Sequence, residues 1–330
     1  EAGHHRLDSG RSGRDRGSLQ GRCRRGRLGL AGWGAEAQAG DGLQVVATTN
    51  IVADAVRNVV GEAGTVVALM GPGVDPHLYQ ASQGDVRRLA GADIIFSNGL
   101  QLEGRLGDVL ARMARRVPTC AVTELLPVEE LLAAEGFGGA YDPHVWFDVR
   151  LWMKAVERIR DALVEVDPER APIYQANARA YLETLAELDA WVRERLAQIP
   201  PQRRVLVTAH DAFGYLGRAY GLEVVGLQGI STDAEYGLAD VIQLVDLLVE
   251  RQIGAVFVET SVSGRGIRAL IEGAAARGHQ VALGGELFSD ALGAEGTAAG
   301  TYVGMIRHNV ETILAALGPE GPGGSSQGGI

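Results

Sequence analysis

The chain has 330 residues, 46% of them hydrophobic, which is enough to bury a sizeable core and favours two domains over one. Its 41 acidic and 31 basic residues give a formal net charge of −10, which argues against a nucleic acid as a partner. No stretch approaches the roughly 20 apolar residues of a membrane-spanning helix. Cys23 and Cys120 are far apart in the sequence, which excludes a disulfide framework or a thiolate metal cluster.

Residues 1–41 differ in composition from the rest of the chain. An arginine-rich stretch, the short apolar run 28–34 and Ala37-Gln38-Ala39 follow one another like the three parts of a secretory signal. We therefore expect a leader and an exported protein, periplasmic or on the extracellular face of the membrane. A disordered or wrongly translated segment is the alternative. The glycine-rich residues 318–330 are expected to be a disordered tail.

From residue 42 onward, short runs rich in β-formers alternate with helical patterns, as in parallel α/β folds. The expected strands are 44–48, 65–70, 93–97 and 118–122 in the first half, and 204–209, 223–227, 255–259 and 280–284 in the second. Helices are expected near 51–61, 83–91 and 103–116, and near 212–220, 236–251, 264–277 and 300–317. This order predicts two lobes, 42–167 and 200–317, each with a parallel four-stranded sheet and flanking helices.

A different pattern lies between the two lobes. From Glu169 to Gln198 apolar residues recur three or four positions apart without any glycine, which predicts one helix of about 30 residues and about 45 Å. We interpret the segment 168–199 as a rigid connection between the lobes that permits only a small opening. A long helix packed within a single domain is the alternative.

One tripeptide occurs twice, as Asp75-Pro76-His77 and Asp142-Pro143-His144. Because Pro occupies only 11 of 330 positions, a doubled Asp-Pro-His is not expected by chance. Proline restricts its own φ and the residue before it, so each histidine lies on a stiff loop. Two imidazoles held in this way indicate a metal site, although two ordinary turns with exposed histidines would give the same pattern.

The second half offers two more ligands at matching positions. His210 directly follows the predicted strand 204–209, and Asp290 follows the strand 280–284. In open parallel sheets ligands bind beyond the carboxyl ends of the strands, so His77, His144, His210 and Asp290 can face one cleft. Glu286 is a possible spare oxygen ligand, but its spacing from Asp290 indicates that only one of the two faces inward.

Several motifs resemble the TroA-like solute-binding proteins of ABC importers for zinc and manganese. They are the stretches 207–215, 142–148 and 284–290 and the later Gly300-Thr301-Tyr302, within a likeness that covers roughly residues 42–317. The resemblance implies a two-lobe fold with a spanning helix, capture of Zn²⁺ or Mn²⁺ outside the cytoplasm, and delivery to a membrane permease. By motif it assigns His77, His144, His210 and Asp290 as metal ligands. The turn that contains His77 departs from the family pattern. The family usually has Tyr-Glu-Pro after this turn, where this chain has Tyr79-Gln80-Ala81.

Three imidazoles and one carboxylate suit Zn²⁺, which also binds such ligands more tightly than Mn²⁺. Manganese members of the resembled family more often have Glu at the place of His210, and zinc members often carry a histidine-rich loop that residues 123–143 lack. We therefore favour zinc and keep manganese open. Aspartates 75, 142 and 211 are candidates either for orienting the imidazoles or for capping turns.

The main hypothesis is a monomeric metal receptor without catalytic activity. The alternative is a zinc-dependent metallohydrolase, which would keep three protein ligands and an open position for water. Four candidate ligands and the absence of a His-Glu-x-x-His motif favour the receptor. Trp146 and Phe213 are expected to form a dry wall around the site, and His279 and His308 to have surface or packing roles.

Overall fold

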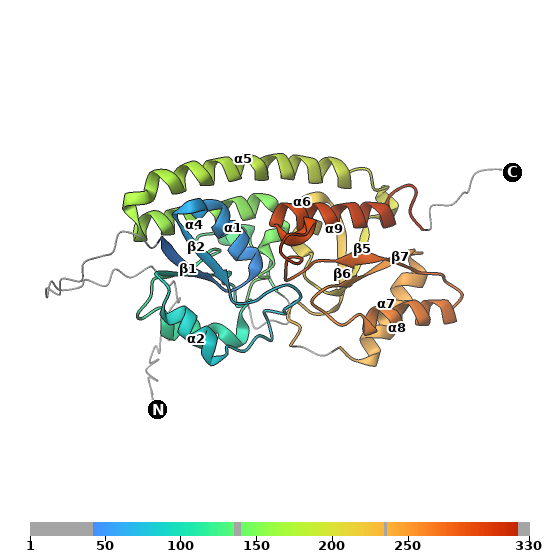
Figure 1. The fold of residues 1–330 in the computed structure, drawn as a ribbon. Coiled ribbons are helices and arrows are strands. Elements are labelled where there is room, and N and C mark those ends of the chain that lie inside the picture. Colours follow the sequence, from blue (N-terminus) through green and yellow to red (C-terminus); the bar gives the residue numbers. More distant parts are fainter. Residues whose placement is uncertain (1–41, 135–139, 234–235, 323–330) are drawn as a thin grey trace, which may run out of the picture.

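The computed structural model describes residues 42–134, 140–233 and 236–322. Figure 1 shows two α/β lobes side by side, with the helix α5 (Ala171–Leu196) running along both of them. Its 26 residues span about 39 Å at 1.5 Å per residue. The predicted fold class, two α/β lobes joined by a long helix, is confirmed. The residue bounds that the sequence suggested for the lobes stay a prediction, and the suggested leader lies outside the described residues.

The first lobe is built on one parallel sheet with the strand order β2-β1-β3-β4, as predicted. The strands are β1 (Leu43–Ala47), β2 (Gly64–Ala68), β3 (Ile94–Ser97) and β4 (Thr119–Ala121). Helices α1 (Asn50–Val60), α2 (Gln83–Ala90) and α3 (Gly107–Met113) follow the first three strands. Local signals set their starts, because Thr49 caps α1 and Ser82 forms a capping box with Asp85 at α2.

The second lobe contains the four expected parallel strands, but they pair two by two. The strands are β5 (Val205–His210), β6 (Glu223–Gln228), β7 (Ala255–Glu259) and β8 (Ala282–Leu287), paired as β5-β6 and β7-β8. The helices are α6 (Gly214–Tyr220), α7 (Leu238–Glu250), α8 (Arg265–Ala276) and α9 (Tyr302–Leu317).

The expected four-stranded sheet of the second lobe is therefore corrected to two two-stranded sheets. Strands β5 and β7 are neighbours, yet no strand pairing joins them in the described residues. At their carboxyl ends the backbone N–H of His210 donates to the side-chain Oε1 of Glu259 at 2.9 Å. A side chain thus takes the donor that a ladder hydrogen bond would use.

One long helix was not among the expected elements. Helix α4 (Val149–Val166) begins at Asp148, whose side chain accepts hydrogen bonds from the backbone N–H groups of Arg150 and Leu151. Its apolar side packs against α5 and α1, and Trp152 is fully buried there. Short 3₁₀ turns η4 (Val145–Phe147), η5 (Pro168–Arg170) and η7 (Ala298–Gly300) precede α4, α5 and α9 respectively.

The largest hydrophobic core passes through both lobes. It contains apolar side chains of α1, α4, α5, α6 and α9 together with one face of the strands β1, β5 and β7. A separate core of the second lobe lies between its strands and the helices α7 and α8. Because α5 packs on both lobes over a shared core, hinge bending would expose apolar surface and therefore costs free energy.

The chain after α9 is described as far as Pro322. The guanidinium of Arg203 donates to the carbonyl oxygens of Ala316, Gly318 and Pro322. Residues 318–322 form bends and turns, and residues 323–330 lie outside the described part, so the expected disordered tail stays a prediction. None of the helices described is both long and apolar enough to cross a membrane.

Candidate metal centre

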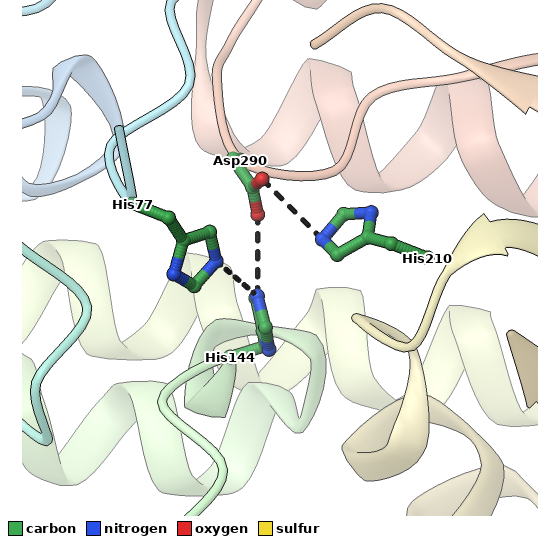
Figure 2. A group of neighbouring side chains, drawn as sticks. All are labelled: His77, His144, His210 and Asp290. Carbon is green, nitrogen blue, oxygen red and sulfur yellow. Dashed lines mark hydrogen bonds and ion pairs between the residues drawn. The ribbon is translucent and has the colours of Figure 1, made fainter. Parts of the chain in front are cut away.

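Four side chains from distant parts of the sequence converge between the lobes (Figure 2). The Nε2 atom of His144 lies 3.3 Å from Nε2 of His77 and 3.3 Å from Oδ1 of Asp290. Nε2 of His210 lies 3.4 Å from Oδ2 of Asp290. The potential ligand atoms of all four residues lie within 4.8 Å of one another, and no side chain is more than 3% exposed. The structure therefore brings together the four residues predicted from the sequence.

The geometry leaves the carboxylate of Asp290 available to a cation. Apart from the two imidazole contacts, neither of its buried oxygens has a hydrogen-bond partner in the described residues. A buried carboxylate without such partners is costly unless a positive charge compensates it. Glu286, the other acidic candidate, is exposed on β8 and does not belong to this group.

The doubled Asp-Pro-His forms the same turn twice. Oδ1 of Asp75 accepts a hydrogen bond from the backbone N–H of His77 at 2.8 Å, and Oδ1 of Asp142 accepts one from His144 at 2.9 Å. These are Asx-turns, in which an aspartate fixes the backbone two residues on. Together with the intervening proline, each turn presents its imidazole from a stiff loop.

The two aspartates differ in what else they contact. Oδ1 of Asp142 also lies 2.7 Å from Nδ1 of His144, so Asp142 both caps the turn and orients the ring. In contrast, Oδ2 of Asp75 accepts a hydrogen bond from the hydroxyl of Thr232 in the second lobe at 2.6 Å. The sequence left open whether these aspartates orient an imidazole or cap a turn. Asp142 does both, whereas Asp75 caps the turn without contacting the ring of His77 in the described residues.

His210 is oriented by a residue that the sequence reasoning missed. Its Nδ1 lies 2.5 Å from Oε2 of Glu259, whose other oxygen accepts from the backbone N–H of His210. Asp211, the neighbour in sequence, was the expected candidate for this role. The available signal was that Glu259 ends a predicted strand, which places it at the same sheet edge as His210. With Nδ1 engaged, Nε2 is the nitrogen that faces the centre.

The electrostatic environment differs among the histidines of the first lobe. Burial lowers the pKa of His77 to about 3, so this imidazole is neutral, the form that can bind a metal. Burial also acts to lower the pKa of His144, but the carboxylates of Asp142 and Asp290 outweigh it and raise the pKa to about 9.

Burial and neighbouring charges also have opposite effects on the pKa values of His210 and Asp290. Burial would lower the pKa of His210, yet Glu259 and Asp290 raise it well above the ordinary value. For Asp290 burial alone would raise the pKa, and the two neighbouring imidazoles hold it well below the usual range. The buried carboxylates thus favour positive charge at the centre, which a metal dication supplies.

Trp146 borders the group, because its ring lies edge-on to that of His144 with centroids 5.2 Å apart. Phe213 packs against Phe147 with centroids 4.5 Å apart, and its expected place in the wall of the site stays a prediction. All three rings are almost completely buried. The remaining described histidines lie elsewhere, since Nε2 of His279 contacts the carbonyl of Ile253 and Nε2 of His308 contacts that of Glu286.

A buried group of three imidazoles and one carboxylate between two α/β lobes is typical of proteins that bind a divalent cation. Comparison with known proteins gives the family. Residues 45–316 match the model of the family described as zinc-uptake complex component A, periplasmic. The chain belongs to this family of metal-binding solute-binding proteins of ABC importers, so the resemblance noted in its sequence is confirmed.

Individual relatives are named for different metals. The chain is 52% identical over 275 residues to the manganese-binding lipoprotein MntA of Bacillus subtilis, covering 83% of this chain and 90% of that protein. It is 46% identical over 286 residues to the zinc-binding protein TroA of Treponema pallidum, covering 86% and 92%. The solved structure of the periplasmic zinc-binding protein TroA matches with a TM-score of 0.82 and 46% identity, over 84% of this chain and 100% of that one.

Membership in the family settles the general function. Its members are metal-binding components of metal uptake, and they are not enzymes. The expectation of a receptor without catalytic activity is therefore confirmed, and the metallohydrolase alternative is excluded.

Proposed function

We propose that this protein captures a single divalent transition metal, Zn²⁺ in preference to Mn²⁺, with His77, His144, His210 and Asp290 as its four ligands. The observation that carries the proposal is the convergence of three Nε2 atoms and one carboxylate in a buried group. Asp142 and Glu259 direct those nitrogens by holding the opposite side of two rings.

The ligand set favours zinc. Zn²⁺ prefers four nitrogen and oxygen ligands in a tetrahedron, and three imidazoles with one carboxylate supply such a set. The potential ligand atoms lie within 4.8 Å of one another, close enough to converge on one ion. Mn²⁺ prefers a larger shell of oxygen ligands, for which this nitrogen-rich group is poorly suited.

The proposal also covers the location of the protein and the membrane permease that receives its metal. The matching family is described as periplasmic, and one relative is named a lipoprotein. We propose that the protein works as a monomer outside the cytoplasm and passes its metal to an ABC-type permease in the membrane. Residues 1–41 would then serve as the leader that directs export.

The decisive experiment is metal analysis of the purified protein followed by direct competition. The metal-free protein is titrated with Zn²⁺ and with Mn²⁺, each in the presence of a chelating indicator. We expect one metal per chain and tighter binding of Zn²⁺. Tighter binding of Mn²⁺ would refute the zinc preference, and no binding of either metal would refute the whole proposal.

A further inference from the structure

Asp290 lies in the second half of the sequence, yet its loop makes hydrogen bonds to the first lobe. The side chain of Asn50, the first residue of α1, makes two hydrogen bonds to the backbone of Leu292. Its Nδ2 donates to the carbonyl of Leu292 at 3.3 Å, and its Oδ1 accepts from the N–H of Leu292 at 2.9 Å. Asn50 is 8% exposed and Leu292 2%, so water competes little for these bonds.

A second hydrogen bond to the first lobe, at Ser289, holds the other side of the same loop; we call these bonds between the loop and the first lobe ties. The indole Nε1–H of Trp146 donates to the carbonyl of Ser289 at 3.1 Å. Trp146 lies two residues after His144, so the loop of one candidate ligand is bonded directly to the loop of another. Asp290 is thus anchored to the first lobe both immediately before and shortly after its own position in the chain.

These ties continue beyond the loop. The backbone N–H of Tyr302, at the start of α9, donates to Oδ2 of Asp54 on α1 at 3.0 Å. The hydroxyl of Tyr302 donates to the carbonyl of Trp146 at 2.7 Å. Both Leu292 and Tyr302 also belong to the large core that both lobes share. Hydrogen bonds at Ser289, Leu292 and Tyr302 thus join this stretch to the first lobe.

Contacts with the second lobe come earlier in the chain. Asn309 holds both backbone groups of Phe288, and the hydroxyl of Ser261 lies 2.8 Å from that of Ser289. The chain crosses from one lobe to the other at Ser289, one residue before Asp290.

His210 has the opposite anchoring. Its imidazole and its backbone N–H both contact Glu259 on β7, and the following N–H of Asp211 donates to the carbonyl of Gln228 on β6. Both partners belong to the second lobe. In the described residues no hydrogen bond joins the backbone or Nδ1 of His210 to the first lobe.

We infer that Asp290, although it follows a strand of the second lobe, is positioned by the first lobe, whereas His210 is positioned by Glu259 of the second. Asn50 and Trp146 are the positioning residues that assign Asp290 to the first lobe. The inference rests on the proposed function. Removing either positioning residue therefore loosens the loop of Asp290 while leaving all four ligands in the chain.

The test removes each tie without touching a ligand. Asn50→Ala deletes both bonds to Leu292, and Trp146→Phe deletes only the indole donor while keeping an aromatic ring. Matched controls are Asn58→Ala, an exposed asparagine on the same helix whose Nδ2 donates to the carbonyl of Asp54, and Trp191→Phe on α5. Release of Zn²⁺ to excess chelator is measured for each, and Co²⁺ serves as a spectroscopic probe of the ligand set.

Residues that orient ligands typically contribute 10- to 100-fold to metal affinity, so we expect Zn²⁺ release about 10- to 100-fold faster in both variants. We also expect altered Co²⁺ absorption bands, which a general loss of stability in a folded protein would not produce. Circular dichroism of the metal-free variants confirms that they fold. If either folded variant kept wild-type release and spectrum, the inference would be overturned. Failure of the wild type and controls to bind Zn²⁺ would instead refute the proposed function.

Discussion

Glu259→Gln isolates the orientation of one imidazole from the rest of the site. In the wild type, Oε1 of Glu259 accepts from the backbone N–H of His210 at 2.9 Å, and Oε2 lies 2.5 Å from Nδ1. Glutamine has the same shape, and its remaining oxygen can keep the backbone contact. Its amide group can only donate, so it forces Nδ1 of His210 to become an acceptor and moves the ring proton to Nε2. The nitrogen that faces the centre then has no lone pair for a metal.

The expected loss follows from that single contact. A hydrogen bond to a charged group contributes about 1.5–3 kcal/mol, and a partner that orients a ligand typically contributes 10- to 100-fold in affinity, or about 1.4–2.8 kcal/mol. The two ranges agree. We therefore expect the Zn²⁺ affinity of Glu259→Gln to fall by about 10- to 100-fold, with a smaller change in the stability of the metal-free protein.

The assay is competition with a chelating indicator at neutral pH, with thermal unfolding of the metal-free protein alongside. Glu286→Gln is the matched control, because this glutamate is exposed on β8 and lies outside the group of ligands. Wild-type Zn²⁺ affinity in Glu259→Gln would refute the reasoning. An equal loss in the Glu286 control would show that the effect is not specific to the orientation of His210.

Three further outcomes are expected. Zn²⁺ at a hundred times Kd should stabilise the wild type by about 2.7 kcal/mol, seen as a rise in Tm that His144→Ala and Asp290→Ala abolish; an unchanged wild-type Tm would contradict the site. Asp85→Ala should lower the free energy of unfolding by about 1–2 kcal/mol at neutral pH through lost capping of α2. Burial acts to raise the pKa of Asp85, but hydrogen bonds led by those from Ser82 lower it below 3.8, so this contribution is present above that pH and lost as pH falls through the lowered pKa. The difference between wild type and variant in chemical denaturation should therefore shrink in acid, and a constant difference would contradict the assignment. Gly226→Ala should destabilise by about 1–3 kcal/mol, because the new Cβ would lie 2.5 Å from the backbone nitrogen of Asp211; Gly71→Ala, with nothing within 4 Å, is the control, and equal stabilities would contradict the steric argument.

Elements with local signals were predictable from the sequence. The start of α2 follows from the Ser82–Asp85 capping box, and the length of α5 follows from apolar spacing without glycine. Helix α4 was not predicted, although Asp148 caps it and its buried apolar residues recur three or four positions apart, so the sequence does carry a local signal for it. The pairing of β5 with β6 alone was also not predictable, since strand pairing depends on groups far apart in the chain.

The candidate ligands were predictable for a similar reason. The two Asp-Pro-His turns depend on contacts within three residues, and His210 and Asp290 follow strands whose carboxyl ends form one edge. The residue that orients His210 was not predictable, because Glu259 is 49 positions away and carries no motif of its own. The same holds for Asn50, which bonds to Leu292 across 242 positions.

The sequence by itself determined which side chains this protein offers to a metal and the stiff local turns that carry two of them. Only the tertiary structure decided how the four are held. Asp142 and Glu259 fix the rings, and Asn50 and Trp146 bring Asp290 to the first lobe. Local turns follow from neighbouring residues, whereas such ties exist only once the chain has folded and buried both partners together.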